Sequence, residues 1–205
     1  MPHGGALFLD EIVEFAPKVL ETLREPLEEG AITISRAGST ATYPARFTLV
    51  AAMNPCPCGH AGDPAVPCRC LPDAIERYRN RLSGPILDRI DLRVHVPRIP
   101  YERLRDEPTA EPSAAVRARV IAARERMCAR SSRPNAELGT AALRRHCRLD
   151  EAADALIGTA MRTRRLSPRA YHRILRVART AADLAGHERI TADDVGTALL
   201  LRAQP

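Results

Sequence analysis

Two adjacent carboxylates at the end of a short apolar run are the first residues in the chain that could do chemistry. Asp10 and Glu11 directly follow Ala6-Leu7-Phe8-Leu9. An apolar run that ends abruptly in acidic residues is typical of a buried parallel strand, and ligands of open α/β sheets bind at that end of the strands. An Asp there can hold nucleotide-bound Mg²⁺, and an adjacent Glu can polarise an attacking water. An ordinary strand that ends in an acidic turn has the same short pattern, so this string alone does not distinguish a nucleotide site from a plain structural turn.

A second apolar run ends in a polar side chain of another kind. Residues 47–53 have the composition of a buried strand, and Asn54-Pro55 follows them. Because the carboxyl ends of parallel strands meet at one edge of a sheet, neighbouring strands would bring Asn54 close to Asp10 and Glu11. The Asn54 amide could then orient the same water.

Four cysteines lie within fifteen residues, as two Cys-x-Cys pairs. These are Cys56, Cys58, Cys68 and Cys70, and His60 is a spare ligand. Four thiolates suit tetrahedral Zn²⁺, so the sequence favours a structural zinc site. The spacing differs from the usual Cys-x₂-Cys, and a reduced, cysteine-rich surface loop is the alternative. Cys128 and Cys147 lie in helical patterns, which predicts packed thiols.

Composition and charge restrict the class of protein. The 205 residues contain no apolar run long enough to span a membrane and no secretory signal, so we expect a cytoplasmic protein without a membrane partner. The net charge of +6 is uneven: residues 1–100 carry 11 basic and 12 acidic side chains, and residues 101–205 carry 20 and 13. The second half could face the phosphates of a nucleotide or a nucleic acid, or it could be a solvated helical surface.

A phosphate-binding loop is missing from the sequence. Its one lysine, Lys18, follows Pro17 in a helical pattern, so the string Gly-x-x-x-x-Gly-Lys-Ser/Thr does not occur. That loop supplies most contacts to nucleotide phosphates, and we therefore expect this chain alone to bind ATP weakly.

The elements that must position these residues follow from periodicity and from stop signals. In the first half we expect a helix over 15–29, a hairpin of strands 31–35 and 41–45, a strand over 47–53, a helix over 72–82 and a strand over 92–96. A proline-rich linker over 98–112 follows. The sequence after the linker predicts helices over 113–128, 140–148, 150–164, 168–185 and 192–202. Ser167 and Thr191 are the expected N-caps of the last two, and Gly186 is the expected stop of the helix over 168–185. Ile174, Ala178, Ala181 and Leu184 are the expected buried face of the fourth of these helices.

Nine ordered strings resemble a known family over nearly the whole chain, the magnesium-chelatase-like AAA+ ATPases of the ComM/YifB type. They are LFLDE (7–11), REPLE (24–28), ISRA (34–37), YPARF (43–47), AAMNP (51–55), RLSGP (81–85), LDRID (87–91), LSPRAY (166–171) and RILRVART (173–180). Each string alone is weak, but their joint order is highly specific.

The resemblance implies an α/β fold, a partial AAA+ (P-loop NTPase) αβα core over 1–97 from Walker B to the arginine finger, with a helical lid over 113–205. It also implies the role of each site residue. Asp10 and Glu11 match Walker B, with Asp10 on magnesium, and Asn54 matches sensor 1. Arg89 matches the arginine finger that reaches a neighbouring subunit's γ-phosphate, and Arg169 matches sensor 2. Without the pattern, a surface ion pair would be the better interpretation of either arginine.

The hairpin resembles the pre-sensor-1 hairpin of this AAA+ branch, whose tip lines a central pore and contacts DNA backbone. Arg36 is the matching DNA-binding candidate. A purely structural hairpin is the equal alternative, because charge that binds a DNA backbone has no sequence signature of its own.

The implied function is ATP hydrolysis by a DNA-acting motor subunit, with branch migration in recombination or natural transformation as candidate activities. Its cofactors would be ATP and Mg²⁺, and its partners DNA and a homo-oligomeric ring, hexameric by resemblance. Complete family members start with an upstream domain and Walker A, so we expect this chain to be a fragment, a truncated gene or a misassigned start. The alternative is a non-hydrolysing, zinc-containing nucleic-acid-binding or ring-partner module that supplies Arg89 in trans. A porphyrin magnesium-chelatase ATPase subunit ranks third.

Overall fold

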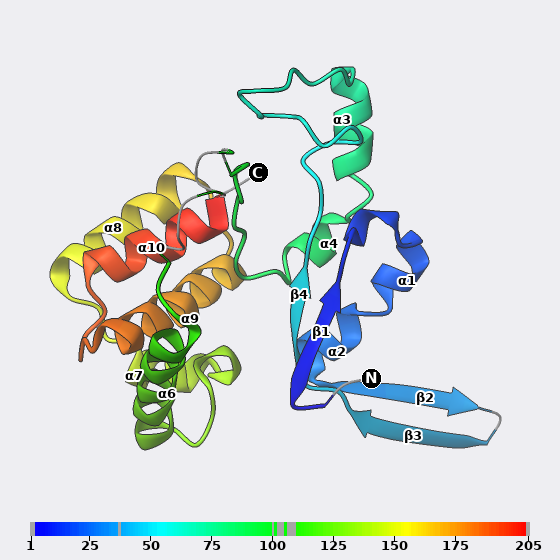
Figure 1. The fold of residues 1–205 in the computed structure, drawn as a ribbon. Coiled ribbons are helices and arrows are strands. Elements are labelled where there is room, and N and C mark those ends of the chain that lie inside the picture. Colours follow the sequence, from blue (N-terminus) through cyan, green and yellow to red (C-terminus); the bar gives the residue numbers. More distant parts are fainter. Residues whose placement is uncertain (1–2, 37, 100, 102–104, 106–109, 204–205) are drawn as a thin grey trace. The chain divides into compact units, whose positions relative to one another are not determined.

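The computed structural model describes residues 3–36, 38–99, 101, 105 and 110–203. The chain divides into two compact units, Met1–Ile90 and Asp91–Pro205, which are treated separately below (Figure 1). Unit 1 mixes helices and strands, and unit 2 is helical. Most of the predicted linker, at residues 100, 102–104 and 106–109, lies outside the described residues.

Unit 1 contains a parallel strand pair that carries the predicted site. Strands β1 (Gly5–Leu9) and β4 (Phe47–Ala51) pair in register, with Leu7 opposite Leu49 and Leu9 opposite Ala51. The prediction that the two strands are neighbours is confirmed, and their carboxyl ends meet at one edge. A small core packs against them, formed by Ile12, Val13, Leu20, Leu23, Tyr78 and Leu82.

The segment between β1 and the hairpin forms three short helical pieces. They are η1 (Ile12–Glu14), α1 (Pro17–Glu21) and α2 (Arg24–Glu29). The predicted single helix over 15–29 is therefore wrong. Pro26 has no N–H to donate to the Thr22 carbonyl, and its ring would clash with that carbonyl in a continuous helix. Gly30 ends α2 with φ +68, a left-handed conformation that glycine adopts without strain.

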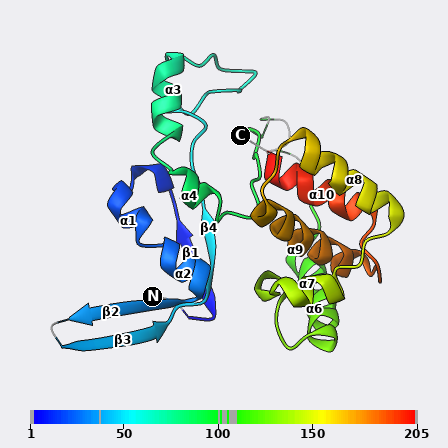
Figure 2. The same ribbon diagram turned by 180° about the vertical axis from the view of Figure 1, so that it is seen from behind.

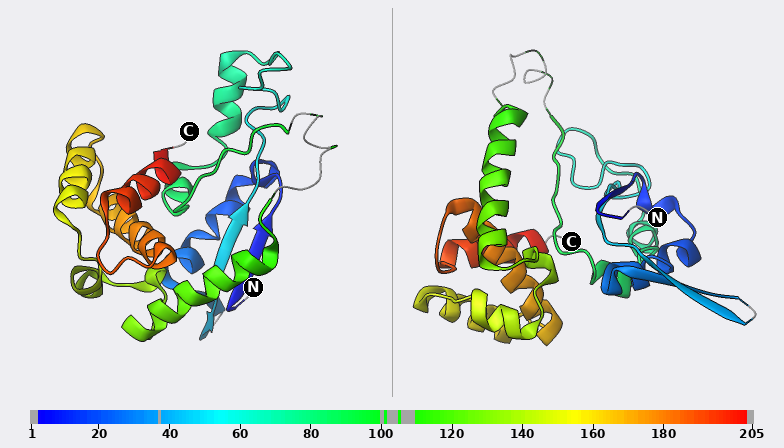
Figure 3. Two further views of the ribbon diagram at one scale, coloured as in Figure 1. Left: turned by 60° about the vertical axis from the view of Figure 1, so that its left-hand side comes forward. Right: turned by 90° about the horizontal axis from the view of Figure 1, so that it is seen from below.

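The predicted hairpin is present as β2 (Ala31–Arg36) and β3 (Ser39–Pro44), paired antiparallel. It projects away from the other elements of unit 1 (Figure 3). Its side chains are exposed beyond the first two residues of β2, so core packing holds only its base. Hydroxyl pairs join the strands along one face, including Thr33 with Thr42 at 3.3 Å between their oxygens.

Two further helices complete unit 1, α3 (Pro72–Arg79) and α4 (Gly84–Leu87). Ser83 caps α4 by accepting a hydrogen bond from the Ile86 N–H at 3.4 Å.

The predicted strand over 92–96 is wrong. These residues, at the start of unit 2, make no strand pairing, and Val94 and Val96 are exposed. The Arg93 N–H donates instead to the Leu201 carbonyl at 2.7 Å. Alternating hydrophobicity alone cannot make a strand, because a strand also needs a partner for its main-chain groups.

The described part of unit 2 is built mainly on helices from residue 113 onward. They are α6 (Ser113–Arg130), η2 (Asn135–Glu137), α7 (Thr140–His146), α8 (Glu151–Thr163), α9 (Pro168–Ala185) and α10 (Ala192–Ala203). Helix α9 lies at the centre, between the α8 and α10 pair and the α6 and α7 pair (Figure 2). The described residues contain no helix with the length and apolar character needed to cross a membrane.

The ends of α9 and α10 confirm the predicted caps. The Ser167 hydroxyl accepts from the Ala170 N–H at 3.2 Å, Pro168 is the first helical residue, and Gly186 ends α9 with φ +82. At the start of α10, the Thr191 N–H donates to an Asp194 carboxylate oxygen at 2.9 Å, and the Asp194 N–H donates to the Thr191 hydroxyl at 3.4 Å.

The predicted buried face of α9 is only partly correct. Ile174 and Ala178 are fully buried, whereas Leu184 is exposed. Its neighbour Asp183 is buried instead, together with Arg179 one turn earlier. The observed buried face of α9 is therefore rotated relative to the face expected from its apolar residues, and it includes an ion pair.

Candidate functional site

The carboxylates after β1 lie in a tight, tethered turn. The Ala52 N–H donates to the Leu9 carbonyl at 2.9 Å, and the Ile12 N–H donates to the Ala52 carbonyl at 3.0 Å. Between these bonds, Glu11 has φ +48, a left-handed conformation that is uncommon for residues with a side chain. Its N–H donates to the Asp10 carboxylate at 3.0 Å. Such backbone outliers persist where the surrounding structure holds them, and they cluster at functional sites.

Glu11 and Asn54 line one cavity of about 420 Å³ in unit 1. The other lining residues come from η1, the cysteine loop, α3 and the segment just after it: Glu14, Pro57, Ala74, Arg77, Tyr78 and Arg81. The structure thus brings together two of the predicted residues. Asp10 is next to Glu11 in the chain but is not among the lining residues.

The polar groups of this cavity are partly satisfied by one another. Arg81 forms an ion pair with Glu14 at 3.1 Å. Burial raises the pKa of the Tyr78 phenol, although a hydrogen bond with the Asn54 main chain acts in the opposite direction. The Arg79 Nε donates to the Pro55 carbonyl at 3.4 Å, so α3 holds the segment that follows Asn54.

Arg89 lies just after α4 and is held by other parts of unit 1. One guanidinium nitrogen donates to the Pro85 carbonyl at 2.7 Å, and another forms an ion pair with Glu28 of α2. Its side chain is only 9% exposed. It is not among the residues that line the cavity of Glu11 and Asn54.

Arg169 is the second residue of α9, in unit 2, and its side chain is exposed. The predicted position in the first turn of a helix is confirmed, and anions are favoured there by the helix dipole and the free N–H groups.

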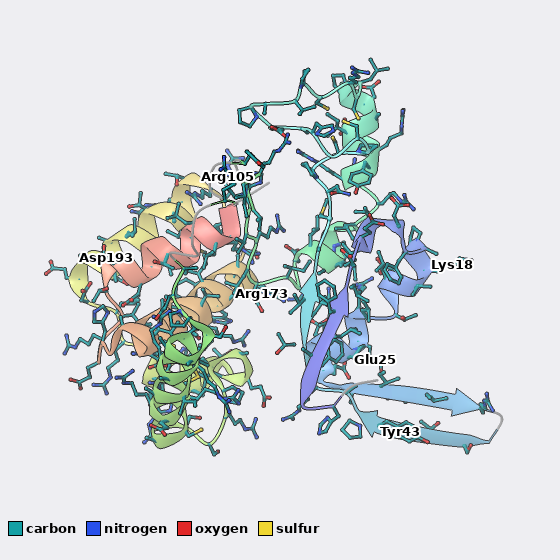
Figure 4. All side chains as sticks on the ribbon, viewed as in Figure 1. Lys18, Glu25, Tyr43, Arg105, Arg173 and Asp193 are labelled. Atoms are coloured by element: carbon teal, nitrogen blue, oxygen red, sulfur yellow. The ribbon has the colours of Figure 1, made fainter. Side chains whose placement is uncertain are left out.

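Arg36 is exposed at the end of β2, opposite Ser39. It is the one charged residue between positions 31 and 44. Ile34 lies on the same face of the hairpin by strand alternation and is half-exposed, as is Tyr43 on β3, labelled in Figure 4.

The four loop cysteines form one group. The sulfur atoms of Cys56, Cys58, Cys68 and Cys70 all lie within 4.8 Å of one another. The sulfur–sulfur distances are 3.4 Å from Cys56 to Cys58, 3.7 Å from Cys56 to Cys68 and 3.6 Å from Cys58 to Cys68. A tetrahedral Zn²⁺ with Zn–S bonds of about 2.3 Å requires sulfurs about 3.8 Å apart. The donor set and its dimensions therefore fit zinc.

Main-chain N–H groups point at this sulfur group. The Ala61 N–H lies 3.3 Å from the Cys56 sulfur. Hydrogen bonds from the His60 and Arg69 main chain lower the pKa of Cys58 to about 6, and the neighbouring Cys58 raises the pKa of Cys70 to about 12. The pKa values differ because ionisation of one thiol disfavours ionisation of its neighbours. A bound divalent cation would remove this repulsion, because its charge stabilises every thiolate.

The remaining predictions about this chemistry have mixed outcomes. His60 does not belong to the sulfur group and lies 3.9 Å from the Asp63 carboxylate. Cys147 is a packed thiol as predicted, and burial raises its pKa to about 11. Cys128 is exposed, so its predicted packing is wrong.

Sequence reasoning missed the α3 side of the cavity and the partner of Arg89. Ala74, Arg77, Tyr78 and Arg81 follow a helical i, i+3, i+4, i+7 spacing, which could have indicated one shared face. No local signal identifies Glu28 as a partner, because it lies 61 residues away from Arg89 in the chain.

Comparison with known proteins gives a consistent result along the chain. Residues 1–104 match the family described as "Magnesium chelatase, subunit ChlI", and residues 110–202 match "Magnesium chelatase, subunit ChlI C-terminal". The chain is 46% identical over 201 residues to "Competence protein ComM" of Haemophilus influenzae, covering 98% of this chain and 39% of that protein. It is also 46% identical over 206 residues to "Uncharacterized protein YifB" of Escherichia coli, covering 99% and 40% respectively. A Mycobacterium tuberculosis relative, "Uncharacterized protein Rv2897c", is 44% identical over 204 residues, covering 98% and 40%. The chain thus spans about 40% of the length of these relatives.

Proposed function

This chain belongs to the magnesium chelatase subunit ChlI family, in its ComM/YifB-like branch, and on that premise we propose that it is the Walker B-to-lid part of an AAA+ ATPase subunit that acts on DNA. The observation that carries the proposal is the shared cavity of Glu11 and Asn54 at the carboxyl ends of two paired parallel strands. This is where nucleotide-hydrolysing α/β folds keep the groups that act on water.

Each residue at the strand ends has a role in this proposal. Asp10 supplies the hard carboxylate oxygen that Mg²⁺ prefers, and the ion, when bound with ATP, neutralises charge on the phosphates. Glu11 accepts a hydrogen bond from the attacking water and polarises it. Asn54 orients the same water from the neighbouring strand.

Arg89 and Arg169 contribute positive charge in the proposed assembly. Arg89 acts in trans, at the γ-phosphate of a neighbouring subunit, so activity requires a homo-oligomeric ring, a hexamer by resemblance. Stabilisation of the transition-state charge by such an arginine contributes about 10³–10⁵ in rate. Arg169 contacts phosphate from the helical unit as sensor 2. Action on DNA implies a cytoplasmic protein.

Contact with DNA is assigned to the hairpin, with Arg36 as the phosphate-binding residue. The exposure of the hairpin and its lone guanidinium support backbone contact without base reading. The name of the Haemophilus relative, a competence protein, agrees with an activity in natural transformation or recombination. Branch migration is the candidate reaction.

The cysteine loop is proposed to hold a structural Zn²⁺ through Cys56, Cys58, Cys68 and Cys70. All four sulfurs belong to the protein, which leaves no open position for a substrate, and closed tetrahedral sites of this kind are structural.

The test compares this chain with a chimaera that carries the upstream phosphate-loop segment of a relative, each with and without branched DNA. We expect ATP hydrolysis by the chimaera, at least 100-fold loss of kcat in Glu11→Gln and about 10³-fold loss in Arg89→Ala. Glu29→Gln and Arg119→Ala are the matched controls, since both side chains are exposed. A folded, ring-forming chimaera that hydrolyses no ATP would contradict the ATPase proposal and favour the non-hydrolysing ring-partner module.

A mixing experiment tests action in trans. Rings assembled from Glu11→Gln and Arg89→Ala subunits contain some interfaces with an intact Glu11 on one side and an intact Arg89 on the other. We therefore expect the mixture to recover part of the activity that each pure variant lacks. No recovery in mixed rings would mean that Arg89 acts within its own subunit or not at all.

A further inference from the structure

Helix α2 carries two carboxylates that bind two different parts of unit 1. Glu25, labelled in Figure 4 beside the base of the hairpin, accepts a hydrogen bond from the Thr33 N–H at 3.0 Å. Glu28, almost one turn later, forms the ion pair with Arg89. The six-residue helix ends at Gly30, and β2 begins at the next residue.

Arg89 depends on Glu28 for its placement. The guanidinium is largely buried, and a buried charge needs a partner of opposite charge. Glu28 forms an ion pair with it, the Pro85 carbonyl takes a further donor, and the Glu21 carboxylate adds a weaker electrostatic interaction. The Arg89 Nε is buried without a hydrogen-bond partner, so the guanidinium keeps an unused donor.

The hairpin depends on α2 in a similar way. Beyond Ile32 its side chains are exposed, so the core does not fix the direction of the strands. Its main-chain links to the rest of unit 1 lie at the root, where the Ala45 N–H donates to the Gly30 carbonyl at 2.8 Å. The root is tight, because a Cβ on Gly30 would lie 2.7 Å from the Arg46 Cγ. The hydrogen bond that the Thr33 N–H donates to Glu25 adds a further contact between α2 and the exposed part of β2.

We propose that α2 is a positioning element that joins Arg89 to the hairpin: Glu28 sets the place of the guanidinium, and Glu25 sets the direction of β2. The inference rests on the proposed function and deepens it. A nucleic acid that displaces the hairpin moves α2 and hence Arg89. By linkage, a phosphate that draws Arg89 away from Glu28 changes the affinity of the hairpin for nucleic acid by the same factor. Glu25 and Glu28 touch neither ligand and act only through their partners.

The first test measures ATP hydrolysis by the phosphate-loop chimaera with and without branched DNA. We expect Glu28→Gln to lower kcat about tenfold with the KM for ATP within twofold, since a misplaced arginine loses transition-state contacts and not ground-state binding. We expect Glu25→Gln to lower the ratio of DNA-stimulated to basal rate at least threefold. Glu29→Gln removes the same charge from the same helix at an exposed position and should match the unsubstituted chimaera in both measurements. Glu28→Asp keeps the charge and should recover part of the lost kcat.

The second test needs neither nucleotide nor a ring, because it uses the chain as it stands. Amide hydrogen exchange is followed at Thr33, whose N–H is bonded to Glu25. We expect Arg89→Ala and Glu28→Gln to speed exchange at Thr33 at least threefold, although neither residue makes the hydrogen bond to the Thr33 N–H. Glu29→Gln should leave it unchanged. A thermal melt within 2 °C of the parent identifies variants that are folded.

The outcomes separate this inference from the function on which it rests. If the unsubstituted chimaera does not hydrolyse ATP, the proposed function fails. Amide hydrogen exchange at Thr33 then still tests whether α2 couples Arg89 to the hairpin. If the chimaera is active but Glu25→Gln and Glu28→Gln behave like Glu29→Gln, the inference is overturned and the proposed function stands. Unchanged exchange at Thr33 in both Arg89→Ala and Glu28→Gln also overturns it.

Discussion

Asp183→Asn should be the most destabilising conservative change in unit 2. Asp183 is 1% exposed on the inner face of α9. Its two carboxylate oxygens accept a bidentate pair of hydrogen bonds from Arg130 at 2.7 and 2.6 Å, and one of them accepts a third from the Asn135 amide at 2.8 Å. Arg179, one turn earlier and itself 2% exposed, forms an ion pair with it at 3.1 Å. One carboxylate therefore serves two guanidinium groups.

The magnitude follows from what the substitution leaves behind. Asparagine has nearly the same size, so no cavity forms, but one acceptor oxygen becomes an NH₂ group that faces other donors. Arg179 and Arg130 then lack their shared counter-ion, and Arg179 has no access to water. Removing one partner of a buried ion pair costs about 3–5 kcal/mol. For a unit of this size, at about 4 °C per kcal/mol, we expect the melting temperature to fall by about 12–20 °C.

The assay is urea or thermal unfolding of the whole chain, followed by far-UV circular dichroism, at a series of pH values. Burial raises the pKa of Asp183, but the hydrogen bonds from Arg130 and Asn135 outweigh that effect and hold the pKa below its ordinary value. A carboxyl with a lowered folded-state pKa stabilises the fold above its unfolded pKa, about 3.9, and loses that contribution as the pH falls through the folded value. The difference between parent and variant should thus be constant from pH 7 to about 5 and shrink below about pH 4.

Glu111→Gln is the matched control for this measurement. Glu111 pairs with Arg119, but the two side chains are 43% and 51% exposed, and exposed pairs contribute about 0–1 kcal/mol. A loss below 1 kcal/mol in Asp183→Asn, or a difference that does not shrink in acid, would refute the reasoning from buried charge.

Three smaller changes test other parts of the chain. Ser167→Ala removes the N-cap of α9 and should lower the free energy of unfolding by about 1 kcal/mol, measured by urea titration. Gly186→Ala puts a side chain at φ +82 and should cost about 1–2 kcal/mol in the same titration, and no loss would mean that the helix end rearranges freely. Cys58→Ser should abolish stoichiometric zinc, measured by elemental analysis of chain refolded with Zn²⁺, whereas Cys128→Ser should retain one ion per chain; equal zinc content in both variants would contradict the four-sulfur site.

Local signals in the sequence predicted most of the elements and the strand-end part of the site. The rule that parallel strands present their carboxyl ends at one edge was enough to bring Glu11 and Asn54 to one cavity. Helix caps at Ser167 and Thr191 and the hairpin turn are equally local, since each involves residues at most a few positions apart.

Two predictions failed because a residue's state depends on a partner distant in the chain, whereas the single helix over 15–29 failed for the local reason given above. Residues 92–96 have the alternation of a strand, yet strand formation needs a neighbouring edge, and alternation carries no information about one. The acidic and basic residues of α9 look like a solvated stripe, and Leu184 looks like part of the core. Asp183 is buried in its place because Arg130 and Asn135, 53 and 48 residues away, satisfy it.

Arg89 has both a local sequence motif and a partner distant in the chain, and the distant partner matters for the role proposed for it. Its motif is local, so the sequence singled it out as a candidate, but its partner Glu28 lies 61 residues earlier and was not predictable. The proposed role requires Arg89 to be correctly placed before the neighbouring phosphate arrives, and an unpaired guanidinium in a largely buried position would cost several kcal/mol. The Glu28 carboxylate of the same subunit removes that cost, and because 47% of its side chain is exposed, water could solvate it if a phosphate replaced it at Arg89, as proposed above. In the proposed assembly the phosphate would replace Glu28 as the anionic partner of Arg89, and Glu28 lies on the helix that leads directly into the hairpin.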